Sequence, residues 1–345
     1  MYNSAKEYAD LIKTEEYEYS AEPDDLEERK AMLRAQYAEQ IKLIRYDLDA
    51  EFTPTRTKYQ HILDMHKVMF CASLPEDIQA EFAAQFHYTT ADNRRMYARI
   101  KRSPDQRFYA LFISSSLITI LHKLGKLELA VHYPGRVVSC SRYPDEKVTR
   151  LQLIEMLAET YAHFRLTKLP LGPLIILEEN LDFQHYLTLT TQEKLLAYHE
   201  IAHFLNGDLE PDANQQKLSV DYPNLSYQRE HYADLVGFAL LLREEKYYGE
   251  VSEQDRKRIL LALIGLFKVQ YDLQGPETKD YPHPFNRLLI IIECFYGKST
   301  AGTIGDAIEN DRFHVLDVQK LAIENLKEEK YEAYIDQQLK LRFQS

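Results

Sequence analysis

The sequence predicts a mainly helical α+β protein that carries a small β hairpin or sheet. Three observations support that class. Apolar residues recur at three- to four-residue spacing over most of the chain, which is typical of amphipathic helices. Short β-branched stretches interrupt this spacing between residues 127 and 182, and they indicate strands. Beyond Asp182 the helical spacing returns, and glycine and proline provide its breaks.

The first 126 residues predict a helical region. Asp24 is a good N-cap for the first helix, and Thr53 or Thr55 for the second. Pro75 stands where the third helix would begin, a position that suits proline because no backbone N–H is needed there. The expected helices cover residues 26–48, 59–70, 75–86 and 107–126.

The next stretch predicts the β structure. Residues 127–133 and 136–143 are short segments with strand-favouring residues, and the Pro-Gly pair between them is a turn signal. We therefore expect these two segments to form a β hairpin. A helix over residues 147–166 should follow, and then a strand within residues 172–180.

The remainder of the chain predicts helices separated by short breaks. The breaks are expected at Gly207, Tyr222-Pro223, Gly275-Pro276 and Gly297. Residues 315–343 carry many charges and predict one long helix with a solvated outer face. The expected organisation is an N-terminal helical region over residues 1–126, a core over residues 127–298 and a C-terminal helical segment over residues 299–345.

Length and composition exclude several classes of protein. The 345 residues are 45% hydrophobic and 28% charged, which is ordinary for a folded protein that buries a sizeable core. The formal net charge is -12, so the chain as a whole repels nucleic acid. We therefore expect neither DNA nor RNA as a partner.

Cysteine usage and targeting signals favour a soluble protein of the cytoplasm. Cys71, Cys140 and Cys294 have no paired or metal-type spacing, so we expect reduced thiols. The N-terminus carries acids where a signal peptide carries bases and an apolar run. The longest apolar stretch, over residues 108–121, is too short to span a bilayer. We accordingly expect no membrane partner.

One segment carries a metal-binding motif. Thr190 and Glu193 match the T-x-x-E pattern of a capping box, which predicts a helix start at this point. His199 and His203 stand four residues apart, so both imidazoles leave one face of the helix and can reach one ion. Glu200 lies between them. In an H-E-x-x-H site such a glutamate does not ligate, but holds the metal-bound water and takes its proton.

A second helix supplies a further ligand. A catalytic zinc ion needs a third protein ligand and leaves its fourth position to water. Glu230 is the natural third ligand, in a largely apolar helix that Ser226 is expected to open. Asp234 follows one turn later and can accept the free N–H of a ligating histidine, for which we expect His199. The alternative is an acid pair on a solvated face, which the apolar character of the helix disfavours.

The two motifs together resemble those of a known class of metallopeptidases. The segment HEIAHFLNGD, followed by E-x-x-A-D, resembles the gluzincins of the HtpX and CAAX-prenyl-protease type. It looks even more like the Lit-type phage-exclusion proteases, which pair H-E-I-x-H with R-E-x-x-A-D at a similar distance. The resemblance covers about residues 190–297. It implies a zincin-like core, one Zn²⁺ and an intracellular protein substrate, with a role in phage defence or a stress response.

The same resemblance implies groups that act on the oxyanion. Both related groups have a His-Pro turn that opens a helix carrying an arginine, usually six positions after that histidine. Here Arg287 follows His283 by four positions and Tyr281 by six. Either His283 or Tyr281 is therefore a candidate to stabilise the oxyanion, as is Arg287 itself. The alternative is a plain helix start, with Arg287 paired to a carboxylate in the core.

The predicted function is hydrolysis of a peptide bond in a specific intracellular protein by a zinc-activated water, with Glu200 as the general base. An alternative from a different class is a non-catalytic interaction protein in which zinc is structural and stabilises the fold. A third candidate is a regulatory protease that acts on a repressor. The sequence shows no convincing helix-turn-helix to support it.

Overall fold

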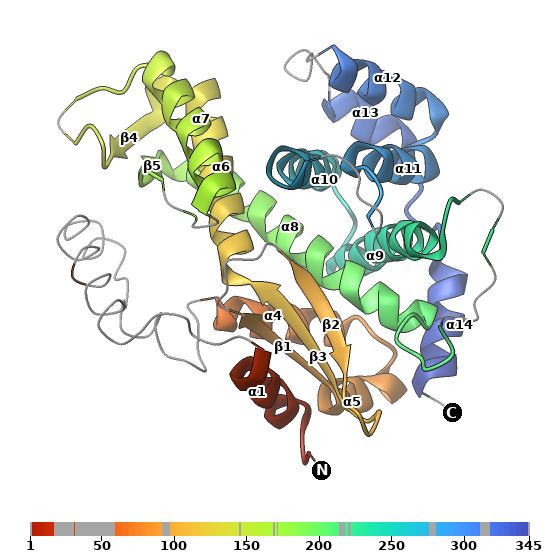
Figure 1. The fold of residues 1–345 in the computed structure, drawn as a ribbon. Helices are drawn as coiled ribbons and strands as arrows, with labels where there is room; N and C mark the ends of the chain where they lie inside the picture. The colour runs from red at the N-terminus through yellow and green to blue at the C-terminus, as the bar shows by residue number, and fades with distance from the viewer. Residues whose placement is uncertain are drawn as a thin grey trace. The chain divides into compact units, whose positions relative to one another are not determined.

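The computed structural model of the chain is mainly helical with two small sheets, which confirms the predicted α+β class (Figure 1). It describes residues 2–16, 31, 59–91, 97–144, 146–167, 170, 172–213, 218–219, 222–275, 281–310 and 318–343. Apart from residue 31, the predicted helix over residues 26–48 lies outside this part of the chain. Among the described residues, none of the helices combines the length and apolar composition needed to cross a bilayer.

The chain forms two compact units. Unit 1 comprises Met1–Val68 and Phe82–Glu178, and unit 2 comprises Met69–Glu81 and Glu179–Ser345. The boundaries expected after residues 126 and 298 therefore fall inside unit 1 and unit 2, respectively. Helices α4 (Gln60–Ala72) and α5 (Glu76–Gln85) confirm two of the predicted N-terminal helices.

Unit 1 contains a three-stranded sheet. Its strands are β1 (Phe86–Ala91), β2 (Ala98–Arg102) and β3 (Tyr109–Ser114), in the order β1-β3-β2. Strand β3 pairs in parallel with β1 and antiparallel with β2, with Tyr109 opposite both Phe86 and Arg102. Every residue of β3 is buried, as expected for a central strand covered on both faces. Helix α1 (Ala5–Glu16) packs on β1 and β3.

The structure corrects two expectations for unit 1. The predicted helix over residues 107–126 is wrong in its first part, because β3 precedes α6 (Ser115–His132). Periodicity does not separate the two, since a strand buried on both faces is as continuously apolar as a buried helix. The predicted hairpin is also wrong, because residues 127–132 continue α6. Strand β4 (Val137–Cys140) pairs instead with β5 (Ile175–Leu177).

The other predicted elements of unit 1 are present. Helix α7 (Arg150–Thr167) and strand β5 occupy the expected segments, and a single 3₁₀ turn, η1 (Pro134–Arg136), contains the Pro-Gly pair. Strands β1 and β2 lie in the region expected to be helical, so that region is of mixed structure.

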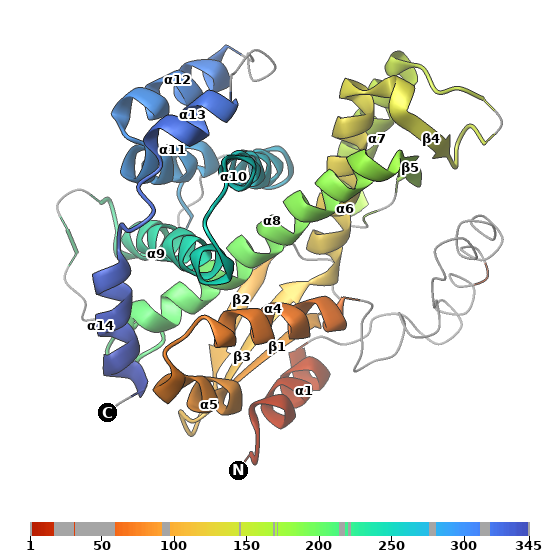
Figure 2. The same ribbon diagram turned by 180° about the vertical axis from the view of Figure 1, so that it is seen from behind.

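The regular secondary structure in the described part of unit 2 is helical. The helices after α5 in this unit are α8 (Glu179–Asn206), α9 (Leu225–Tyr248), α10 (Glu253–Gln274), α11 (Pro284–Tyr296), α12 (Lys298–Glu309), α13 (Val318–Asn325) and α14 (Glu332–Phe343). The predicted breaks at Gly207, Tyr222-Pro223, Gly275 and Gly297 fall between these helices, and Pro276 lies outside the described residues. Helix α8 packs against α9 and α10, and α11 packs against α9, α10 and α12. Helix α14 lies against α8 and α9 near the C-terminal end of α8 (Figure 2).

Three details of unit 2 differ from the expectation. Helix α8 begins eleven residues before Thr190, so the T-x-x-E pattern lies in the middle of a helix and caps nothing. The N-cap of α9 is Asn224, whose side chain accepts the backbone N–H of Tyr227 at 2.8 Å, in place of Ser226. The expected single helix over residues 315–343 is divided into α13 and α14, and Tyr331 between them has a φ of 71°.

A buried ionic network joins the three central helices of unit 2. Lys194 of α8 has its Nζ 2.6 Å from Glu244 Oε1 and 3.2 Å from Glu245 Oε1, both on α9. Arg258 of α10 donates to Glu245 Oε2 at 2.7 Å. Lys194 and Glu244 are almost fully buried. A buried charge is costly unless it is paired, so this network fixes how the three helices are arranged.

The network makes a prediction about stability. Lys194→Met should destabilise the fold by about 3–5 kcal/mol, because Glu244 would be left as a buried charge without its cation. The double variant Lys194→Met/Glu244→Leu should recover much of that loss, because it removes both charges. Urea unfolding of the three proteins measures both values. A loss of well under 1 kcal/mol in the single variant would contradict the role given to this pair.

Candidate metal centre

The candidate metal centre lies where α8 and α9 come into close contact. Gly237 of α9 faces the backbone of His199, and a Cβ at this glycine would lie 2.8 Å from the His199 backbone nitrogen and 2.9 Å from its Cα. Real Cβ atoms do not approach backbone so closely. The absence of a side chain at residue 237 therefore lets the two helices approach until the motif residues of each can meet.

Three side chains meet at one point of this contact. His199 and His203 leave α8 on one face, and their Nε2 atoms are 3.2 Å apart. Glu230 of α9 places its carboxylate oxygens 3.4 Å from His199 Nε2 and 3.7 Å from His203 Nε2. The three form a group that could hold a metal ion. The sequence-predicted ligands are thus brought together.

Two of the distances in this group are close to those of a tetrahedral ion. Zinc binds imidazole nitrogen and carboxylate oxygen at about 2.0–2.2 Å, so two ligand atoms on a tetrahedron are about 3.3–3.6 Å apart. The two Nε2 atoms are 3.2 Å apart, and Glu230 Oε2 is 3.4 Å from His199 Nε2. The 3.7 Å contact with His203 Nε2 is made by the other oxygen, Oε1, so the Glu230 carboxylate must move for one oxygen to approach both histidines.

Each histidine is held by a carboxylate on its other nitrogen. His199 Nδ1 lies 2.9 Å from Asp234 Oδ1, as the sequence predicted, and His203 Nδ1 lies 2.8 Å from Asp208 Oδ2. An ionised carboxylate only accepts, so each Nδ1 of a neutral ring carries the proton. The lone pair is then on Nε2, the atom that faces the shared point. This is the tautomer that a metal ion requires.

Asp208 was not predicted from the sequence. Helix α8 ends at Asn206, and Gly207 adopts a φ of 82°, a left-handed conformation that glycine accepts without strain. The chain then turns back, and the Asp208 backbone N–H donates to the carbonyl of His203 at 3.0 Å. This turn brings the carboxylate under the ring of His203. The sequence feature that could have indicated this role is the position of Asp208, an acidic residue directly after the predicted helix end at Gly207.

Two arginines hold the two aspartates. Arg287 of α11 donates to both Asp234 oxygens, at 2.7 and 2.6 Å, and its Nη2 is also 3.5 Å from Glu230 Oε2. Arg229 Nε is 3.5 Å from Asp208 Oδ1, and a second nitrogen of Arg229 donates to the carbonyl of Ala213. Three carboxylates thus face two guanidinium groups, and a proton on His199 or a metal cation can balance the remaining negative charge.

The contacts within the cluster keep His199, Glu230 and Asp234 charged. Burial acts to lower the pKa of His199, but its hydrogen bonds to Asp234 and Glu230 outweigh burial and raise that pKa to about 10. Burial acts to raise the pKa of Glu230, but the bond from His199 and the charge of Arg287 lower it to about 2. The pKa of Asp234 lies below its usual range, because Arg287 and His199 outweigh its burial.

The remaining predicted site residues lie at different distances from this centre. Glu200 follows His199 on α8 and is 7% exposed. His283 is the N-cap of α11, where its Nδ1 accepts the backbone N–H of Phe285 at 3.2 Å and its ring packs against Tyr271. Tyr281 is 57% exposed. Three groups were expected to act on the oxyanion. Among the described contacts, Arg287 is the one of these that touches the ligand cluster.

Helix α14 supports the end of α8 that carries His203. Arg342 donates to Glu210 at 2.8 Å, in the turn that contains Asp208, and Tyr334 donates to Asn206 Oδ1 at 2.8 Å. The ring of Phe343 packs against Phe204, with centroids 5.5 Å apart. The turn that positions Asp208 is therefore fixed from outside by the last described helix.

Comparisons of the chain with protein-family models, with curated proteins and with solved structures found no match. The functional argument therefore rests on the geometry of the site and on the motif resemblance.

The close approach at Gly237 makes a prediction. Gly237→Ala should lower zinc affinity by at least about tenfold, because the new Cβ pushes α9 away from the His199 backbone and metal ligands tolerate shifts of only about 0.2 Å. Gly302→Ala is the matched control, since a Cβ there meets open space in α12. Competition titration with a chromophoric chelator measures both. Equal zinc affinity in the two variants would contradict the argument.

The two aspartates make a second prediction. Asp234→Asn and Asp208→Asn should each weaken zinc binding by about 10–100-fold, because an amide does not hold the Nδ1–H tautomer as a carboxylate does. The visible spectrum of the Co²⁺ protein checks the geometry independently. Asp212→Asn, in the same turn but outside these contacts, is the control. Wild-type affinity in Asp208→Asn would show that His203 needs no such support.

Proposed function

We propose that this protein is a zinc-dependent endopeptidase that hydrolyses a peptide bond in a protein substrate. The observation that carries the proposal is the convergence of His199, His203 and Glu230, whose ligand atoms lie within 4.8 Å of one another and could hold one metal ion. Two imidazoles and one carboxylate suit zinc. Three protein ligands are also the number typical of a catalytic zinc site, whereas structural sites have four.

In the proposed hydrolysis, the zinc ion and the protein side chains have separate roles. When bound, zinc would lower the pKa of a water molecule and polarise the scissile carbonyl. Glu200, between the two histidines, would accept the proton of the attacking water and pass it to the leaving amine. Asp234 and Asp208 would keep the histidines in the ligating tautomer. The cluster is partly shielded from bulk solvent, which strengthens each of these electrostatic contacts.

Arg287 would act mainly through Asp234. Its two shortest hydrogen bonds both go to that carboxylate, so its guanidinium is already occupied. We therefore assign Arg287 to positioning His199 through Asp234. His283 and Tyr281 stay as candidates for the group that stabilises the oxyanion, a contribution of about 3–4 kcal/mol where such a donor acts.

The substrate class and the setting come from the motif resemblance. It favours a specific intracellular protein as substrate and a role in phage defence or a stress response, in the cytoplasm. The structure is compatible with a reducing compartment, because none of Cys71, Cys140 and Cys294 forms a disulfide.

Metal analysis tests the first part of the proposal. The purified protein should hold one zinc ion per chain, and His199→Ala/His203→Ala should hold none. Full zinc occupancy in that double variant would place the metal elsewhere and remove the proposed centre.

Glu200→Gln tests the second part and separates an enzyme from a zinc-stapled protein. This variant keeps every ligand but cannot accept a proton, so it should bind zinc normally and lose hydrolysis. Glu179→Gln, at the exposed start of the same helix, is the control. Terminal proteomics of cells that express each protein should show cleavage products for wild type and control only. Products that persist in Glu200→Gln would exclude Glu200 as the base.

A further inference from the structure

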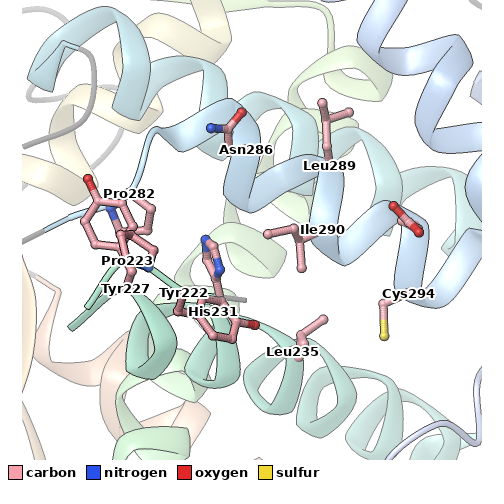
Figure 3. Close-up of a pocket in the computed structure, with 11 residues that line it drawn as sticks. Tyr222, Pro223, Tyr227, His231, Leu235, Pro282, Asn286, Leu289, Ile290 and Cys294 are labelled. Atoms are coloured by element: carbon pink, nitrogen blue, oxygen red, sulfur yellow. The ribbon is translucent and has the colours of Figure 1, made fainter. Parts of the chain in front are cut away.

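A cavity of about 680 Å³ lies between α9 and α11 in unit 2 (Figure 3). Its volume lies within the range of about 300–1,000 Å³ found for pockets that bind small organic groups. One wall is a stripe of α9 at four-residue spacing, Tyr227, His231 and Leu235. The opposite wall, on α11, combines apolar Leu289 and Ile290 with polar Asn286 and Glu293.

His231 is a buried polar side chain in this cavity, and the other lining residues do not satisfy its hydrogen-bonding groups. Its side chain is 6% exposed, and neither ring nitrogen has a hydrogen-bond partner among the described residues. Figure 3 shows the ring pointing from α9 toward α11. A buried imidazole without partners is unfavourable, and buried polar groups in proteins are nearly always satisfied.

An aromatic ring already covers this imidazole. The Tyr222 ring packs on His231 with centroids 5.3 Å apart, and both nitrogens are shielded from solvent in this arrangement. Tyr222 also lines the cavity and is only half-buried. The position over His231 therefore accommodates an aromatic ring, and a ligand that displaces the Tyr222 ring would reach the imidazole.

We propose that this cavity binds an aromatic group that carries a hydroxyl or an N–H, such as a phenol or an indole, with His231 as its hydrogen-bond partner. A neutral imidazole offers one donor and one acceptor. A phenol hydroxyl can pair with either nitrogen, and its ring fits the apolar parts of the walls. The proposal does not rest on the proposed metal chemistry. His231 points about 100° away from Glu230 around α9, so binding here needs no metal ion.

Two probes that differ by one hydroxyl test the proposal. The full-length protein is titrated with p-cresol and with toluene, and binding is followed by protein NMR. Wild type should bind p-cresol about 3- to 10-fold more tightly than toluene, the ratio that one buried hydrogen bond gives. In His231→Phe, which keeps a ring but removes both nitrogens, the ratio should fall to about one. A preference that survives in His231→Phe, or no saturable binding of either probe to wild type, would overturn the proposal.

Two further variants keep the test decisive if His231→Phe does not fold. Ile290→Trp fills the cavity from α11 and should abolish binding of both probes. Tyr222→Ala removes the covering ring and should tighten the binding of both while it keeps the preference for p-cresol. Unchanged p-cresol binding in a folded Ile290→Trp protein would place the site elsewhere and overturn the assignment.

A third probe identifies the source of the aromatic group. N-acetyl-tyrosinamide carries the same phenol on a blocked amino acid. If it binds as tightly as p-cresol, a side chain of a protein partner can occupy the cavity. If only p-cresol binds, the occupant is a free small molecule of the same chemistry.

Discussion

The contact between α8 and α9 at Gly237 is the constraint on which the candidate metal centre depends. The candidate ligands come from both helices, and Glu230 of α9 could not meet the two histidines of α8 if a side chain separated the backbones at this point. The approach has an energetic cost, because glycine in a helix interior is less favourable than alanine by about 1 kcal/mol. Burial of apolar side chains along the interface of the two helices offsets that cost.

The charges of the site form two parallel chains of contacts. One runs from His199 through Asp234 to Arg287, and the other from His203 through Asp208 to Arg229. The histidines and aspartates of the two chains are about equally shielded from solvent. The first chain ends in a bidentate arginine bond at 2.6 and 2.7 Å, whereas the second ends at a single 3.5 Å contact, so it holds its histidine less firmly. The two histidines of the candidate site therefore have unequal support.

The candidate ligands could be predicted from the sequence because they obey short-range rules of helix geometry. Helical spacing fixes which side chains share a face, so the residue pattern alone groups His199 with His203 and Glu230 with Asp234. Asp208 was not predicted because its position depends on the left-handed turn at Gly207. Arg229 was not predicted because it contacts Asp208, whose position was unknown. Strand β3 was mistaken for a helix because its burial on both faces removes the alternating pattern. The pairing of β4 with β5 is a long-range choice that turn signals do not determine.

The contact between α14 and the turn after α8 also has a consequence for the order of events during synthesis. Arg342 leaves the ribosome 132 residues after its partner Glu210. At about 5–20 residues per second, the turn that carries Asp208 would wait about 7–26 s for its support. During that interval His203 would lack the full set of contacts that holds its ring. The nascent chain would therefore acquire its metal affinity late, close to the time when the last helix docks.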